Sequence, residues 1–298
     1  MKTGFVTLVG RPNAGKSTLL NQILDRKIAI VSDKAQTTRH RITGVLTNET
    51  GQIVFLDTPG IHKPRHKLGE RMVEIAQSSL YDADVVYYLV DVNNDFGPGE
   101  QYILNQLQKT DAPVFLLLNK IDRIEKQEVL GLIAQWQSRM EFAEIFPLSA
   151  YKGDNVEALV ETTFKYLEEG PQFYPADSVT DQPEEVVIAE LIREQILQST
   201  RDEVPHSIAV IVEQMKLQDD GKIYVGATIY VERDSQKGII IGKAGTMLRK
   251  IGSRARREIE FLLGEKVYLD LWVKANEDWR NKETAIKSLY LEDDDDEF

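Results

Sequence analysis

The sequence predicts an α/β protein in which a doubly wound, mostly parallel sheet is followed by a smaller α+β domain. A glycine-rich loop at 10–17 joins an apolar strand pattern to a helical pattern, and strand and helix patterns then alternate as far as residue 168. Such alternation is expected where helices connect parallel strands. After a proline-rich stretch the order changes to helix, two strands, helix, long helix and strand. That change indicates a second domain with its own core.

The expected division of the chain follows from these patterns. We expect a first domain at 1–169, a linker at 170–184 that contains three prolines, a second domain at 185–291 and an acidic tail at 292–298. We interpret the tail as a disordered, solubilising end, because a run of like charge cannot bury a core.

Composition excludes several classes of protein. The 298 residues contain no cysteine, which rules out disulfides and thiolate metal sites. The net charge of −12 argues against a protein that coats nucleic acid without specificity, although residues 237–274 hold nine Lys or Arg against four Asp or Glu. No apolar run approaches the roughly 20 residues that span a bilayer, and the amino terminus lacks the pattern of a signal peptide.

The loop at 10–17 fits G-x-x-x-x-G-K-[ST] without a mismatch. Between a strand and a helix, such a loop presents backbone N–H groups to a polyphosphate at the positive end of the helix. Lys16 can then reach the β- and γ-phosphates, and the Ser17 hydroxyl can ligate Mg²⁺. A glycine turn that merely precedes a lysine is the alternative, and the flanking elements disfavour it. The predicted phosphate-binding residues are Gly10, Arg11, Asn13, Ala14, Gly15, Lys16, Ser17 and Thr18.

Further polar motifs follow the predicted strands. Strands at 41–47 and 52–56 lead into Asp57-Thr58-Pro59-Gly60. At the carboxyl end of a strand, Asp57 is placed to hold Mg²⁺ through water, and Gly60 to offer its N–H to a γ-phosphate. An apolar strand at 113–118 ends in Asn119-Lys120-Ile121-Asp122.

The residues after these strands predict guanine selectivity. The Asp122 carboxylate can accept both N1–H and the 2-amino group of guanine, which adenine does not offer, so adenine would leave the charge unpaired. Asn119 would support the base edge, and the Lys120 stem would lie along the base plane. A strand at 143–148 ends in Ser149-Ala150-Tyr151-Lys152, where the Ala150 N–H could contact guanine O6.

These motifs resemble, in order and spacing, the five motifs of Ras-like GTPases. The resemblance implies that Thr38 is the switch threonine that completes the Mg²⁺ shell, with Thr37 as the alternative. Ser17, Thr38 and Asp57 would then hold the metal, Lys16, Thr38, Gly60 and Asn13 would serve catalysis, and Ser149, Ala150 and Lys152 would complete the nucleotide site.

One position departs from the Ras pattern. Ras carries a glutamine after D-x-x-G that orients the attacking water, and this chain has Ile61. Another group must therefore position the water, or hydrolysis stays slow until a partner supplies one. Asn13 stands where some related GTPases coordinate a potassium ion, so K⁺ is a further candidate cofactor beside GTP, GDP and Mg²⁺.

The second domain resembles a KH domain of type II, with its extra elements at the amino end. Its Gly242-Lys243-Ala244-Gly245 loop would clamp about four single-stranded nucleotides by their backbone. A solvated helix face is the alternative explanation of the basic residues that follow. The predicted RNA-binding residues are Gly238, Ile241, Gly242, Lys243, Ala244, Gly245, Arg249, Lys250, Arg254 and Arg257.

A Ras-like domain followed by this KH domain resembles the Era GTPases over nearly the whole chain. The resemblance implies a cytoplasmic GTPase, a monomer, that binds the 3′ end of 16S rRNA and assists assembly of the 30S ribosomal subunit. It leaves peripheral contact with the inner face of the cell membrane open. One alternative is an RNA-binding module whose GTP only sets its conformation; a P-loop small-molecule kinase would give no reason for N-K-I-D or G-x-x-G.

Overall fold

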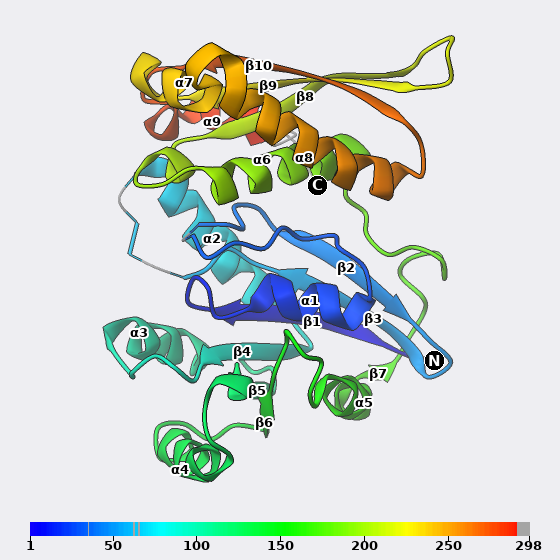
Figure 1. The fold of residues 1–298 in the computed structure, drawn as a ribbon. Helices are drawn as coiled ribbons and strands as arrows, with labels where there is room; N and C mark the ends of the chain where they lie inside the picture. Colours follow the sequence, from blue (N-terminus) through cyan, green and yellow to red (C-terminus); the bar gives the residue numbers. More distant parts are fainter. Residues whose placement is uncertain (35, 62, 65, 291–298) are drawn as a thin grey trace. The chain divides into compact units, whose positions relative to one another are not determined.

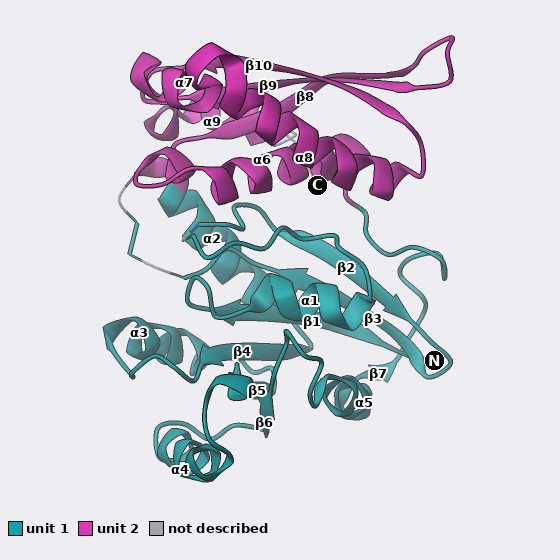
Figure 2. Ribbon diagram, in the orientation of Figure 1, with its two compact units in different colours: residues 1–64, 69–181 teal, residues 65–68, 182–298 magenta. Residues whose placement is uncertain are grey.

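The computed structural model describes residues 1–290 except 35, 62 and 65, so the acidic tail expected at 292–298 lies outside the described residues. The chain divides into two compact units, residues 1–64 with 69–181 and residues 65–68 with 182–298 (Figure 2). Within the described part, no helix combines the length and the apolar character that crossing a membrane requires.

Unit 1 is built on one seven-stranded sheet (Figure 1). Its path runs β2-β3-β1-β4-β5-β6, and β7 pairs with β1. β2 is antiparallel to β3 and β7 is antiparallel to β1, whereas the other pairs are parallel. This topology confirms the doubly wound, mostly parallel sheet. The strands are β1 (Lys2–Gly10), β2 (Ile42–Thr47), β3 (Gly51–Asp57), β4 (Val85–Asp91), β5 (Val114–Asn119), β6 (Glu144–Leu148) and β7 (Glu168–Glu169).

Successive side chains of a strand point to opposite faces of the sheet. The strands here are apolar on both faces, and helices cover both of them. In β4, Tyr87 belongs to a core that includes side chains of α1 and α5, and Tyr88 belongs to a core that includes side chains of α2, α3 and α4. The helices are α1 (Lys16–Leu24), α2 (Lys67–Tyr81), α3 (Pro98–Leu107), α4 (Lys126–Gln137) and α5 (Val156–Tyr166). The loops that carry the sequence motifs leave the carboxyl ends of β1, β3, β5 and β6, where ligands of such folds bind.

Most of the stretch expected to be a linker is fastened to unit 1. The buried Gln52 side chain of β3 accepts hydrogen bonds from the Phe173 and Tyr174 N–H groups, at 2.8 and 3.0 Å, and donates to the Tyr174 carbonyl at 2.9 Å. On β2, the Val45 N–H donates to the Val179 carbonyl at 2.8 Å. We call residues 173–181 the strap. The division between the units, at Asp181–Gln182, therefore falls near the end of the expected linker.

Unit 2 has a three-stranded sheet in the order β10-β9-β8. β8 and β9 are antiparallel and β9 and β10 are parallel, which confirms the KH connectivity. Ile192 of α6 and Ile251 of α8 belong to a core with Val225 and Ile229 of β9, so these helices pack on one face of the sheet. The elements are α6 (Glu184–Ser199), β8 (Ala209–Leu217), β9 (Ile223–Val231), α7 (Asp234–Ile241), α8 (Thr246–Leu263), β10 (Val267–Ala275) and α9 (Glu283–Tyr290).

Candidate functional site

The loop between β1 and α1 has the backbone shape of a phosphate cradle. Gly15 precedes α1 with a φ of 103°, a value that favours glycine, and a Cβ there would collide with the Asn119 side-chain amide. The Lys16 ammonium lies across the loop, 3.3 Å from the Gly10 and Arg11 carbonyl oxygens. Burial lowers the pKa of Lys16, and the Asp57 carboxylate opposes that shift. A buried cation at a helix amino terminus provides a strong site for a polyphosphate.

Three oxygen-bearing side chains meet beside this loop. The Ser17 hydroxyl lies 2.6 Å from Asp57 Oδ2 and 3.0 Å from Thr38 Oγ1, and Thr38 Oγ1 lies 3.4 Å from Asp57 Oδ2. Burial raises the pKa of Asp57, while Lys16 and the two hydroxyls oppose that shift. Asp57 Oδ1 is buried and has no hydrogen-bond partner in the described part of the chain.

This cluster fits Mg²⁺, a hard cation that takes oxygen ligands. The unpartnered carboxylate oxygen gives the cluster unused capacity to hold a metal-bound water. The structure also separates the two threonines that sequence reasoning left open. Thr38 joins Ser17 and Asp57, whereas the Thr37 hydroxyl donates to the Lys34 carbonyl at 2.7 Å.

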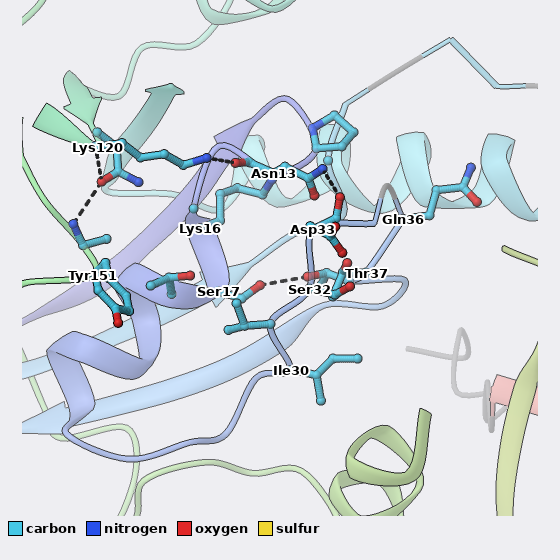
Figure 3. Close-up of a pocket in the computed structure, with 18 of the residues that line it drawn as sticks. Asn13, Lys16, Ser17, Ile30, Ser32, Asp33, Gln36, Thr37, Lys120 and Tyr151 are labelled. Atoms are coloured by element: carbon cyan, nitrogen blue, oxygen red, sulfur yellow. Dashed lines mark hydrogen bonds between the residues drawn. The ribbon is translucent and has the colours of Figure 1, made fainter. Parts of the chain in front are cut away.

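The N-K-I-D and S-A-x-K loops are bound to each other and to the phosphate loop. Asn119 donates to the Ala14 carbonyl at 2.7 Å and accepts from the Ala150 N–H at 2.9 Å. The Lys120 ammonium donates to the Asn13 carbonyl at 2.8 Å (Figure 3). It also pairs with Asp91 at 2.7 Å. The Ala150 N–H assigned to guanine O6 is thus already donating to Asn119.

A neighbouring hydroxyl holds the Asp122 side chain in the lining of this pocket. Ser149 Oγ donates to Asp122 Oδ1 at 2.7 Å and accepts from the Lys152 N–H at 3.2 Å. This bond orients the carboxylate through Oδ1, and it leaves Oδ2 to accept other hydrogen bonds. Asp122 lines the same cleft as Lys16 and Ser17, so base and phosphate positions belong to one cavity.

That cleft has a volume of about 440 Å³, within the range of small-molecule sites. Of the predicted residues, Asn13, Gly15, Lys16, Ser17, Thr18, Thr38, Gly60, Asn119, Lys120, Asp122 and Ala150 line it. The predicted residues that are not among its described lining residues are Gly10, Arg11, Ala14, Asp57, Ser149 and Lys152. The Arg11 guanidinium instead lies 3.7 Å from the Glu100 carboxylate. Sequence reasoning missed other lining residues, most of them in loops without a motif: Pro12, Ile30, Val31, Ser32, Asp33, Gln36, Arg123 and Tyr151 (Figure 3).

The residue that replaces the Ras glutamine points away from the cleft. The Ile61 side chain is 2 % exposed and packs with Ala76 and Leu80 of α2, and its N–H donates to the Gly10 carbonyl at 3.1 Å. Gly60 lies directly against the phosphate loop, where a Cβ would come 2.7 Å from the Pro12 nitrogen. Ile61 is therefore a core residue, and Gly60 is the part of this segment that faces the site.

The G-x-x-G loop of unit 2 has the strained backbone that glycine permits. Gly242, Ala244 and Gly245 have φ values of 71°, 51° and 74°. A Cβ at Gly242 would lie 2.9 Å from the Met247 nitrogen, so the turn into α8 has no space for a side chain at this position. Lys243 and Ala244 are exposed at the tip of this turn.

A groove of about 390 Å³ runs beside this loop between α8 and β10. Of the predicted RNA-binding residues, Gly245 and Arg249 line it. The predicted residues that are not among its described lining residues are Gly238, Ile241, Gly242, Lys243, Ala244, Lys250, Arg254 and Arg257. Of these, Lys250, Arg254 and Arg257 are exposed on α8. The lining residues that sequence reasoning missed are Leu248, Gly252, Ser253, Arg256, Tyr268, Leu269 and Leu271.

Comparison with known proteins assigns both units. Residues 5–120 match the family model described as "50S ribosome-binding GTPase", and residues 203–280 match the KH domain. A single-residue variant of Aquifex aeolicus Era bound to GDP·AlF4⁻ is 45 % identical, with coverage of 97 % of this chain and 99 % of that one and a TM-score of 0.94. Era in complex with MgGDPNP and nucleotides 1506–1542 of 16S ribosomal RNA is 44 % identical, with coverage of 97 % and 98 % and a TM-score of 0.95.

These two structures match the chain over nearly its full length. The chain belongs to the Era family of GTPases and joins a GTPase domain to a KH domain.

Proposed function

We propose that this protein is a GTP-driven switch that binds single-stranded RNA at the 3′ end of 16S rRNA and assists assembly of the 30S subunit. The observation that carries the proposal is the coexistence of a guanine-nucleotide cleft and a G-x-x-G groove in a chain 44 % identical to an Era that binds both MgGDPNP and 16S rRNA nucleotides. Further parts of the proposal are that the protein acts in the cytoplasm as a monomer, with any membrane contact peripheral.

The geometry of the cleft supports a role for each nucleotide-site residue. Lys16 and the N–H groups at the start of α1 bind the β- and γ-phosphates, and Asp122 reads the guanine edge with Asn119 and Lys120 as its supports. Ser17, Thr38 and Asp57 hold Mg²⁺, which supplies positive charge against the phosphate oxygens when bound. Arg11 contributes its backbone, since its side chain is paired with Glu100.

Hydrolysis depends on backbone groups rather than on a side chain at position 61. Because Ile61 is buried, we assign orientation of the attacking water to the Thr38 and Gly60 backbone, which leaves intrinsic turnover on the order of the unassisted Ras rate, about 10⁻⁴–10⁻³ s⁻¹. Asn13 contributes a potassium site against the phosphates. Its side chain donates to the Asp33 carbonyl at 2.7 Å, so Asn13 and the segment before Thr38 can order together (Figure 3).

The RNA site comprises the G-x-x-G turn and the groove between α8 and β10. Gly242–Gly245 lets a sugar-phosphate backbone approach closely, and Arg249 with Arg256 faces the groove. Lys243, Lys250, Arg254 and Arg257 supply longer-range attraction from the exposed surface. We place the functional boundaries at 1–181 for the GTPase unit and at 182–291 for the KH unit.

The decisive experiment measures RNA affinity in two nucleotide states. Binding of RNA corresponding to nucleotides 1506–1542 of 16S rRNA is measured at one fixed salt concentration with GDP and with a non-hydrolysable GTP analogue. We expect tighter binding with the GTP analogue and, by thermodynamic reciprocity, tighter GTP binding with RNA by the same factor. A ratio of one would mean that the two units act independently, and the switch would be refuted.

The burial of Ile61 favours one second candidate, an RNA-binding module in which GTP only sets the conformation. Single-turnover cleavage of GTP separates the two. Measurable phosphate release from the bound nucleotide supports the GTPase switch, whereas persistence of intact GTP with unchanged nucleotide-dependent RNA affinity supports the second candidate.

A further inference from the structure

The KH sheet has a second face, turned away from the core with α6 and α8, which we call the open face; Tyr268 and Trp272 are exposed on it, whereas Thr228 is fully buried. In β9, Val225, Ala227 and Ile229 belong to the core with α6 and α8. Because strand side chains alternate, Tyr224, Gly226 and Thr228 point to the other face. β10 pairs in register, so that Tyr268, Asp270 and Trp272 stand opposite these three residues on the same open face.

This open face carries a pair of tyrosines whose rings are parallel. The Tyr224 and Tyr268 ring centroids lie 6.0 Å apart with an interplanar angle of 19°. A Cβ at Gly226 would lie 3.0 Å from the Tyr224 hydroxyl and 3.1 Å from its Cε1, so the Tyr224 ring lies down over Gly226. Desolvation raises the pKa of Tyr224, and the Asp270 carboxylate, on the neighbouring strand, contributes to that shift. The missing side chain at Gly226 lets the ring lie flat along the sheet.

Two further features extend this flat surface. Trp272 lies four residues beyond Tyr268 on the same face of β10, and the two side chains are 43 % and 56 % exposed. Lys216 of β8 pairs with Tyr224 in register, and its ammonium lies 5.6 Å from the Tyr224 ring centroid. We call Tyr224, Tyr268, Trp272 and Lys216 the aromatic platform.

The platform is continuous with the groove assigned to RNA. Tyr268 lines that groove between α8 and β10 and also stacks with Tyr224, so it stands at the edge where the groove meets the open face. A G-x-x-G loop clamps about four nucleotides. The similar Era structure contains RNA nucleotides 1506–1542, a far longer strand that needs a path beyond such a groove.

We infer that the aromatic platform is a second RNA-binding surface, on which bases of the strand leaving the G-x-x-G groove stack against Tyr224, Tyr268 and Trp272. Exposed aromatic side chains on an open sheet face stack two or three bases in other RNA-binding folds, and base–aromatic stacking tolerates any base. Lys216 places one cation over the Tyr224 ring, while Asp270 adds a negative charge to the same face. Stacking, rather than neutralisation of phosphate, dominates here. The inference rests on the proposed RNA-binding function.

Tryptophan fluorescence of the full-length protein tests the inference directly. Trp136 and Trp279 are 4 % and 0 % exposed, so Trp272 is the indole that a base can reach. The probe is RNA corresponding to nucleotides 1506–1542, with the GTP analogue present. We expect the RNA to quench wild-type emission and to leave the emission of Trp272→Phe nearly unchanged. Equal quenching in both proteins would overturn the inference.

Affinities of matched variants complete the test. Tyr224→Ala and Trp272→Ala should each weaken binding of this RNA by roughly 5- to 150-fold, the range expected for one stacked base, without changing the salt dependence. Tyr224→Phe and Trp272→Phe retain the ring and should bind nearly as wild type does. The control is Phe261→Ala, which removes an aromatic side chain that is 88 % exposed on α8. An equal loss in the control would overturn the inference.

The failure of each proposal has its own signature. Absence of wild-type binding to this RNA would refute the proposed function itself. If wild type binds and Gly242→Asp does not, the groove is established. Wild-type affinity in Tyr224→Ala and Trp272→Ala would then refute the platform alone.

Discussion

Replacing Asp122 by asparagine tests the guanine pocket with little disturbance of the fold. Ser149 Oγ donates to Asp122 Oδ1 at 2.7 Å, and the carbonyl oxygen of an asparagine side chain can accept the same bond. The amide is therefore held in the same orientation, with its NH₂ group where the other carboxylate oxygen was. The guanine N1–H and 2-amino donors then lose a charged acceptor and meet a donor.

The structure allows the size of this effect to be worked out. Two hydrogen bonds to a charged acceptor contribute about 1.5–3 kcal/mol each, so Asp122→Asn should weaken GTP binding by roughly 10²- to 10⁴-fold. Xanthosine triphosphate, whose 2-oxo group accepts from the amide, should bind more tightly to the variant than GTP does. Competition against a labelled nucleotide measures both affinities. Asp154→Asn, at an exposed position of the neighbouring loop, is the control. Undiminished GTP affinity in Asp122→Asn would refute the base-reading role.

Four further outcomes follow from the site and the strap. Lys16→Ala should abolish tight Mg·GTP binding in calorimetry, because it removes the buried cation of the phosphate loop; retained affinity would exclude the loop from phosphate binding. GTP hydrolysis should be faster in K⁺ than in Na⁺ through Asn13, and equal rates would dismiss the potassium site. Gly242→Asp should eliminate RNA binding while GTP affinity stays unchanged, since charge and bulk enter the turn; undiminished RNA affinity would count against the turn as the contact. Gln52→Ala should lower the free energy of unfolding of unit 1 by about 1–3 kcal/mol, because it removes the acceptor of two partly buried strap N–H groups. A smaller change in denaturant titrations would mean that the strap is held by other contacts.

The motifs made much of the fold predictable. The strands of unit 1 are near-continuous apolar runs that end at polar motifs, so Val114–Asn119 and its neighbours could be placed within a residue or two. Three helices escaped the sequence analysis, namely α2, α4 and α9. They carry no motif, and in α4 only Trp136 is buried, so the apolar pattern there is weak.

The nucleotide pocket was more predictable than the RNA groove, for a physical reason. Phosphate, metal and base are met by backbone turns and by short side chains at strand ends, which require particular residues at fixed spacing. The residues that line the groove are set by which side of α8 packs beside β10, and no sequence motif specifies that packing. Arg256 and Arg257 are neighbours in sequence, yet only Arg256 lines the groove. The motif predicted that Lys152 belongs to the nucleotide site. In the structure its backbone N–H donates to the Ser149 hydroxyl, which in turn holds Asp122.

The strap also determines where the GTPase unit can be cut. β2 is an edge strand, and unpaired edges attract strands of other chains. The strap occupies the Val45 N–H and brings the Thr180 hydroxyl 2.7 Å from the Thr43 carbonyl. A fragment ending at residue 169 would keep every nucleotide motif but would lose this cover and three partners of the buried Gln52 amide. A fragment ending at residue 181 keeps both, and we expect it to remain soluble where the shorter one aggregates.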